Sequence, residues 1–138
     1  MNRFLSPSPV WQNQGIALVR MIVGFFMIYH GWEVFDPKAM EGYLGWDQFK
    51  NMSARKFLVY LGKGTELVGG IFLFIGLFTR LACLVLIITM LYITFVVSHG
   101  KIWYEDQHPF LFVLLGFVFL FTGPGSMSLD RILFQKSN

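Results

Sequence analysis

A group of ionisable side chains lies within the first two apolar stretches of this 138-residue chain. The group consists of Arg20, His30 and Glu33 in Ile16–Phe35, and Lys63 and Glu66 in Phe57–Phe78. At membrane depth, an ionised side chain costs several kcal/mol unless it is paired or faces a polar cavity. Two acids, two bases and a histidine in adjacent helices therefore predict a buried polar site that binds a ligand or transfers protons.

Glu66 is the deepest member of the group. Counted from the Asp36 side at about 1.5 Å per residue, it lies about 14 Å in, near the midplane of a bilayer. On the same scale Lys63 lies about 9 Å in, His30 about 8 Å and Glu33 about 3 Å. Antiparallel packing would bring these side chains together on one half of the molecule. The alternative is that the charges pair only to fix the register of the helices.

Arg20 lies nearer the opposite face of the membrane. Its long stem can snorkel outwards or reach inwards towards Glu66. The positive charges of Arg20 and Lys63 would balance Glu33 and Glu66, which leaves His30 as the titratable member of the group.

The segment between the third and fourth apolar stretches adds polar side chains at the expected mouth of this cavity. They are His99, Glu105, Asp106 and His108. These residue types can bind zinc or iron, but their spacing matches no known ligand pattern, so we predict no metal site. No paired-histidine pattern supports haem, and the single cysteine, Cys83, excludes an intrachain disulfide or dithiol.

The composition places the chain in a membrane, because 55% hydrophobic residues and 18% aromatic residues are too apolar for an ordinary soluble domain. A spanning helix needs about 20 residues. The apolar stretches predict helices at about residues 16–35, 57–78, 81–98 and 105–121. The last is long enough only if Glu105–Pro109 form its first turn. The first is too long for a signal-peptide core, so we expect it to be retained.

These helices predict an all-α fold, an integral membrane four-helix bundle in one domain, residues 1–138. The longest connection, Asp36–Lys56, carries Tyr43, Trp46 and Phe49 at spacings near one helical turn. That spacing predicts an amphipathic segment at the membrane interface, with a partly ordered loop as the alternative. A net charge of +3 without a lysine or arginine block gives no indication of nucleic-acid binding.

Three stretches carry a more specific pattern. They read ALVRMIVGFFMIYHGWEVF, GTELVGGIFLFIGLFTRLACLVL and GPGSMSLD. Together they resemble the DoxX family of small four-helix membrane proteins over Gly15 to Ile132. The first stretch is similar to the family's arginine–glycine–glycine pattern at Arg20, Gly24 and Gly31. Many relatives have a basic residue where this chain has Val34.

The resemblance implies a protein of the bacterial inner membrane with both termini in the cytoplasm. Lysine and arginine are divided almost equally between the two sides, so charge alone does not set the orientation. With both termini in the cytoplasm, the polar mouth of the cavity would face the periplasm or exterior.

The resemblance also implies a link to membrane-associated oxidoreductase systems, including quinone-reducing ones. We therefore expect a membrane subunit that binds a quinone or another lipid-soluble ligand in the charged cavity. The chain has no flavin, haem or dithiol motif, so electrons would come from a redox partner protein. Whether the chain is itself an enzyme stays open.

The alternative is a non-catalytic protein that binds membrane lipid or assists membrane-protein assembly. A transporter would need alternating access, which one unit without internal repeats provides only as a homo-oligomer.

Overall fold

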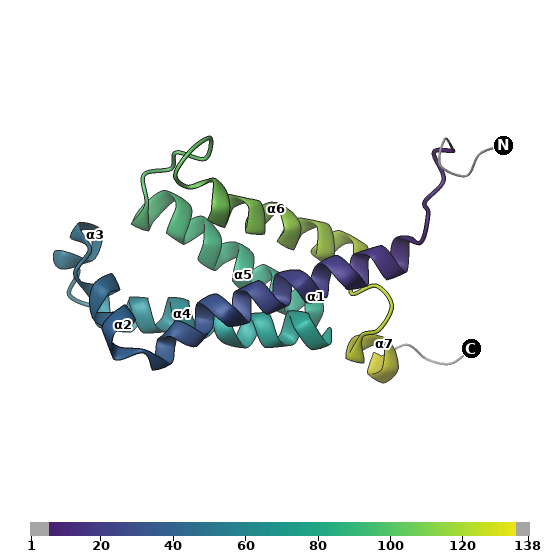
Figure 1. The fold of residues 1–138 in the computed structure, drawn as a ribbon, viewed down its shortest axis with the longest axis horizontal. Coiled ribbons are helices and arrows are strands. Elements are labelled where there is room, and N and C mark those ends of the chain that lie inside the picture. The colour runs from purple at the N-terminus through teal and green to yellow at the C-terminus, as the bar shows by residue number, and fades with distance from the viewer. Residues whose placement is uncertain (1–5, 135–138) are drawn as a thin grey trace.

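The computed structural model describes residues 6–134, and within that range every regular element is a helix. The longer helices run along the longest axis of the molecule (Figure 1) and are α1 (Gln12–Gly31), α4 (Arg55–Ile75), α5 (Thr79–Tyr92) and α6 (Gln107–Thr122). The shorter ones are α2 (Pro37–Leu44), α3 (Asp47–Lys50) and α7 (Leu129–Phe134). A 3₁₀ turn, η2 (Trp32–Phe35), extends α1, and a π-helix, η3 (Ile93–Val97), extends α5. Residues 1–5 and 135–138 of the predicted domain lie outside the described part.

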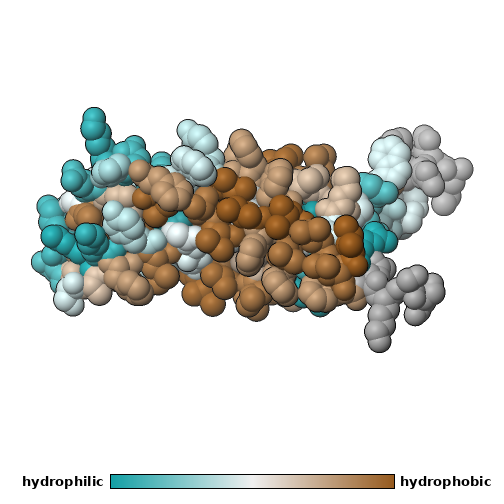
Figure 2. Space-filling view, turned by 90° about the horizontal axis from the view of Figure 1, so that it is seen from below, coloured by the Kyte–Doolittle hydropathy of each residue, from teal (hydrophilic) through white to brown (hydrophobic). Residues whose placement is uncertain are grey.

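Three of the continuous helical segments are long and apolar enough to cross a bilayer. They are Gln12–Phe35 with 24 residues, Arg55–Ile75 with 21 and Thr79–Val97 with 19. The apolar helix α6 has 16 residues, about 24 Å of length, and falls short of that size. Apolar surface covers the middle of the long axis, and hydrophilic residues gather towards the ends (Figure 2). This distribution is typical of an integral membrane protein.

The start of α6 differs from the prediction. Glu105 and Asp106 precede the helix, so Glu105–Pro109 do not form its first turn. The Asp106 carboxylate instead accepts hydrogen bonds from the backbone N–H groups of Lys101 and His99. Asp106, which was expected in the first turn of the helix, therefore holds the loop before α6 instead.

Glycines allow α1 and α4 to pack with their backbones in contact. A Cβ atom on Gly24 would lie 2.5 Å from the backbone nitrogen of Phe74, and one on Gly70 would lie 2.7 Å from that of Ile28. Neither position has room for a larger residue. Small residues of this kind let membrane helices approach closely. The contact fixes the relative position of the two helices that carry most of the ionisable group.

A short turn at Gly76–Phe78 joins α4 and α5. Gly76 has a φ of 68°, a left-handed conformation that glycine adopts without steric cost. Thr79 already belongs to α5. Cys83 is fully buried in the core between α4, α5 and α6, where it packs as a small apolar residue.

The long connection after α1 forms two short helices, α2 and α3. Met40 of α2 and Phe49 of α3 are buried and pack with Val59 of α4 and Val97 of η3. The segment therefore covers one end of the molecule, where α2 lies beside α4 and α3 lies beside η3 (Figure 1).

Candidate functional site

Lys63 links the two acids of the predicted group. Its Nζ lies 2.9 Å from Oε2 of Glu33 and 3.1 Å from Oε2 of Glu66. It also donates a hydrogen bond of 3.4 Å to the backbone carbonyl of His30. Because Lys63 and Glu66 are three residues apart on α4, they share one face of the helix. The ammonium group therefore ties α4 to the end of α1 and to η2.

The two carboxylates differ in their access to the surroundings. The side chain of Glu66 is 7% exposed and that of Glu33 is 35% exposed, with Lys63 at 12% between them. An ammonium with two carboxylates carries one net negative charge when all three are ionised. Removing the cation would leave two like charges close together, which is costly in a buried environment.

Tyr43 of α2 completes the cluster. Its hydroxyl donates a hydrogen bond of 2.6 Å to Oε2 of Glu33, and the Nζ of Lys63 lies 4.6 Å from the centre of its ring. Burial, followed by the hydrogen bond to Glu33, raises the pKa of the Tyr43 hydroxyl. Sequence reasoning treated Tyr43 only as an interfacial aromatic. Its one-turn spacing from neighbouring aromatics indicated a helix but not a polar partner.

A cavity of about 210 Å³ lies between α4, α5 with η3, and the α2–α3 segment, and we call it the aromatic cavity. Its walls include Trp46, Phe49 and Tyr92, and its charged groups are Lys63 and Glu66. Pockets for drug-sized ligands measure about 300–1,000 Å³. This cavity therefore has room for one ring system of a ligand, and a long substituent on that ring would lie outside the cavity.

A second cavity of about 120 Å³ lies on the other side of Glu66, and we call it the histidine cavity. Its polar lining consists of His30, Glu66 and His108. The two imidazole rings have centroids 5.5 Å apart and are inclined by 65°. At about 30 Å³ per water molecule, the histidine cavity has room for a few waters. Glu66 lines both cavities, so it lies on the boundary between the aromatic cavity and the histidine cavity.

The π-helix η3 begins at this boundary. Ile93, its first residue, lines both cavities. A π-helical turn inserts an extra residue into a helix and is frequent at functional sites. This π-helix could not be predicted from the residues, because no residue type is specific to a π-helix.

Of the four predicted mouth residues, only His108 lines one of the two cavities around Glu66. Asp106 holds the preceding loop through the N–H groups of Lys101 at 2.7 Å and His99 at 3.2 Å. Burial opposes ionisation of Asp106, but these hydrogen bonds outweigh it and lower the pKa of the carboxyl. Glu105 forms an exposed ion pair of 3.5 Å with Lys101. Within residues 6–134, no three histidine, cysteine or acidic side chains are arranged to hold a metal ion.

Arg20 does not join the cluster around Lys63. It is fully buried, and its guanidinium donates to the backbone carbonyls of Leu73, Phe74, Pro124 and Met127. The bonds to Phe74, Pro124 and Met127 measure 2.9, 2.8 and 2.8 Å. The Arg20 side chain does not reach towards Glu66. The last turn of α4 leaves backbone carbonyls without an intrahelical donor, and these carbonyls lie close to Arg20.

Comparisons with known proteins agree with the resemblance. The family model DoxX matches residues 15–99. An uncharacterised protein of Haemophilus influenzae is 30% identical over 88% of this chain and 92% of its own length. A Bacillus subtilis protein named putative oxidoreductase CatD is 26% identical over 88% of each chain. No solved structure matches.

Proposed function

This chain belongs to the DoxX family, and from that premise we propose that it is the membrane subunit of an oxidoreductase system. In this proposal, the aromatic cavity binds the ring of a quinone or of a similar lipid-soluble molecule. The observation that carries the proposal is the position of Glu66, a buried acid that lines both the aromatic cavity and the histidine cavity. The similarity to the Bacillus subtilis protein, which is named as an oxidoreductase, supports the same class.

The residues around the aromatic cavity have distinct roles in this proposal. Trp46 and Tyr92 contact the faces of the bound ring. The Lys63 ammonium donates a hydrogen bond to a ring oxygen and stabilises negative charge that develops there. Glu66 transfers the proton that accompanies each electron, as a general acid within reach of the same space.

The histidine cavity serves to return protons to Glu66. His30 and His108 line it together with Glu66, and the His108 residue is exposed. An imidazole has one ring nitrogen that can accept a proton and one that can donate a proton, which suits both histidines to relay protons from the polar end. The electrons come from a partner redox protein, because the chain holds no motif for a redox cofactor of its own.

We further propose a single domain whose fourth membrane crossing is the short helix α6. The α2–α3 segment would then lie at the interface on the non-cytoplasmic side of a bacterial inner membrane, with both termini in the cytoplasm. The starts of α1 and α7 lie at the same end of the molecule, which is compatible with that arrangement (Figure 1).

Binding of a short-tailed quinone to the full chain in nanodiscs tests the proposal. We expect Lys63→Met to weaken binding about tenfold or more, the usual effect of losing a charge-assisted hydrogen bond. Glu66→Gln should leave binding within about threefold, because glutamine retains hydrogen-bonding capacity, but should abolish turnover with a redox partner. If the wild-type chain neither binds quinone nor co-purifies with a redox protein, the proposal is wrong.

A second candidate is a non-catalytic assembly factor. It is favoured by a groove of about 470 Å³ on the outer face of α1, lined by Phe25, Tyr29, Trp32 and Glu33. A membrane helix of a client protein could lie in this groove and bind Glu33 through a polar side chain. In that case Glu33→Gln would abolish capture of the client protein, whereas Gly62→Leu, which fills the aromatic cavity, would leave it unchanged.

A further inference from the structure

An open pocket of about 690 Å³ lies at the end of the molecule opposite to the aromatic cavity. It is formed by the start of α5, α7 and the loop after α6. Arg80 and Arg131 belong to its polar lining, and Phe78, Leu81 and Phe134 belong to its apolar lining. The pocket therefore combines two guanidinium groups with a hydrophobic wall.

Its framework is fixed by hydrogen bonds between α7 and the turn before α5. The Asp130 carboxylate accepts from the backbone N–H groups of Phe78 at 2.6 Å and Thr79 at 2.8 Å. The Asp130 N–H donates to the carbonyl of Gly76 at 2.8 Å. The rings of Phe78 and Phe134 have centroids 5.8 Å apart. The pocket is thus pre-formed by the fold.

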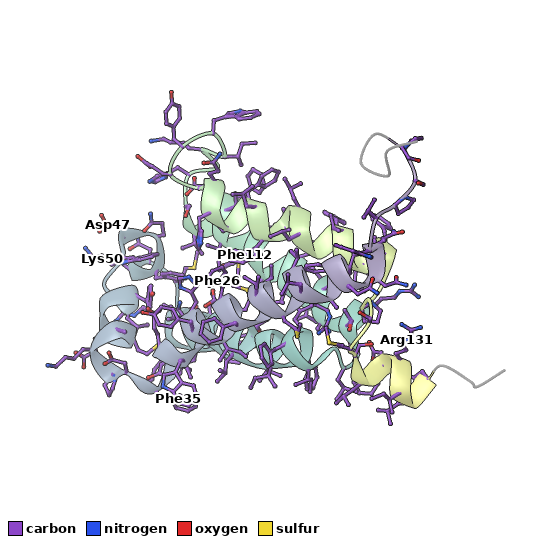
Figure 3. The ribbon with its side chains drawn as sticks, turned by 45° about the vertical axis from the view of Figure 1, so that its right-hand side comes forward. Phe26, Phe35, Asp47, Lys50, Phe112 and Arg131 are labelled. Carbon is purple, nitrogen blue, oxygen red and sulfur yellow. The ribbon has the colours of Figure 1, made fainter. Side chains whose placement is uncertain are left out.

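The charges at this end favour an anion. Asp130 is the only acidic residue near the pocket within the described range, and its carboxylate is engaged by the N-terminus of α5. Arg20 is buried below the pocket against backbone carbonyls, and its charge interacts with that of Asp130. Together with Arg80 and Arg131, it leaves an excess of positive charge. Figure 3 shows Arg131 at this end, far from Asp47 and Lys50.

The pocket also lies at the boundary between apolar and polar surroundings. Arg80 is the second residue of the candidate membrane span Thr79–Val97. On α7, the side chains of Ile132, Leu133 and Phe134 are 76%, 62% and 61% exposed, which suits contact with acyl chains. A soluble anion would make no use of this apolar wall.

We propose that the pocket is a binding site for one anionic phospholipid. The phosphate lies between Arg80 and Arg131, and the acyl chains lie along Leu81 and Phe134. Guanidinium groups bind phosphate oxygens with paired hydrogen bonds, and basic pockets between membrane helices recognise anionic headgroups. The site is separate from both cavities around Glu66, so a test of lipid binding does not depend on the proposed redox role.

Native mass spectrometry of the delipidated full chain tests this site, with phosphatidylglycerol and phosphatidylcholine added in equal amounts. We expect the wild-type chain to retain one phosphatidylglycerol with a preference of about tenfold or more, because each basic side chain attracts anionic lipid. The double variant R80Q/R131Q should bind the two lipids equally. R80K/R131K, which keeps both charges, should retain part of the preference.

The matched control is K38Q/K101Q, which removes two charges from the opposite end and should keep the wild-type preference. Circular dichroism melting of each variant checks that it is folded. Equal binding of the two lipids by the folded wild type overturns the proposal, and so does a preference that survives in R80Q/R131Q or is lost in the control. Complete displacement of phosphatidylglycerol by an equal concentration of inorganic phosphate would assign the pocket to a soluble anion instead.

Discussion

The two ends of the molecule each contain a buried basic side chain, but these side chains have different partners. Arg20 is fully buried and donates only to backbone carbonyls, which the fold holds in place. Lys63 binds the side-chain carboxylates of Glu33 and Glu66, and it lines the aromatic cavity. Arg20 lines none of the cavities described above.

This difference separates a structural charge from a candidate functional one. The Arg20 guanidinium uses four of its five N–H groups on backbone carbonyls, and Arg20 lines none of the described cavities, so it is poorly placed to bind a ligand. An ammonium between two carboxylates can exchange one partner for a ligand oxygen with little movement of the backbone. Both side chains are largely shielded from solvent, Arg20 fully and Lys63 with 12% of its side chain exposed, so the type of partner and the adjacent space are the more useful criteria.

Removal of Arg20 should have the largest effect on stability. Arg20→Met leaves four carbonyls without their donor and should lower the free energy of unfolding by about 3 kcal/mol or more. Arg20→Lys should be intermediate, because an ammonium has three donors and no fork geometry. Thermal unfolding in detergent, followed by circular dichroism, measures both. A loss below about 1 kcal/mol for Arg20→Met would contradict the structural role.

Removal of Lys63 should cost less and should be reversible by a second change. Lys63→Met leaves Glu33 and Glu66 without their shared cation, and we expect a loss of about 2 kcal/mol at neutral pH. Adding Glu66→Gln should restore much of that loss, which a double-mutant cycle measures. Lys101→Met, which breaks an exposed pair, should change stability by less than about 0.5 kcal/mol. If the double variant is no more stable than Lys63→Met, then Lys63 and Glu66 are not energetically coupled.

Tyr43→Phe should produce a smaller effect with a characteristic pH dependence. The hydrogen bond to Glu33 contributes about 1 kcal/mol. The pKa of Tyr43 is raised above 10.0, so its contribution is complete below pH 10 and is lost as the pH rises through the folded-state pKa. The variant should therefore lose less stability than the wild type above pH 10. Tyr104→Phe, at an 83% exposed position, is the control and should not change how the free energy of unfolding depends on pH above pH 10.

Gly62→Leu should leave stability almost unchanged while it removes ligand binding. A Cβ atom at Gly62 would meet no atom within 4 Å, and the residue lines the aromatic cavity. Leucine also favours a helix over glycine by up to about 1 kcal/mol. Gly64→Leu is the matched control, since its Cβ is equally free but lies outside the cavity lining. Undiminished quinone binding by a folded Gly62→Leu variant would show that the ligand lies elsewhere.

Much of the fold could be predicted from the sequence, because apolar stretches of membrane-spanning length leave few alternatives to helices. The ends of the helices were less predictable. Glu105 and Asp106 have the composition of a first helical turn, yet Asp106 binds the N–H groups of the loop before it. That competition between a loop and a helix depends on tertiary geometry and has no local sequence signal.

Part of the candidate site could also be predicted. Depth counting placed Glu33, Lys63 and Glu66 on one half of the molecule, and the structure brings their charged atoms into contact. Their role in binding or proton transfer stays a prediction. The partners of Arg20 could not be found in this way, because backbone carbonyls are present at every residue. Tyr43 was missed because its acceptor, Glu33, is reached only when α2 folds back over the end of α1.

The bonds of Arg20 also impose an order on the assembly of the protein. Two of its four acceptors, Pro124 and Met127, follow it by 104 and 107 residues along the chain. During synthesis from the amino terminus, α1 is therefore delivered to the bilayer long before these carbonyls exist. Until the loop after α6 has been synthesised, the guanidinium lacks these two hydrogen-bond acceptors. A nascent chain that stops before Pro124 therefore lacks two of the four acceptors of Arg20, although α1 can already pack against α4.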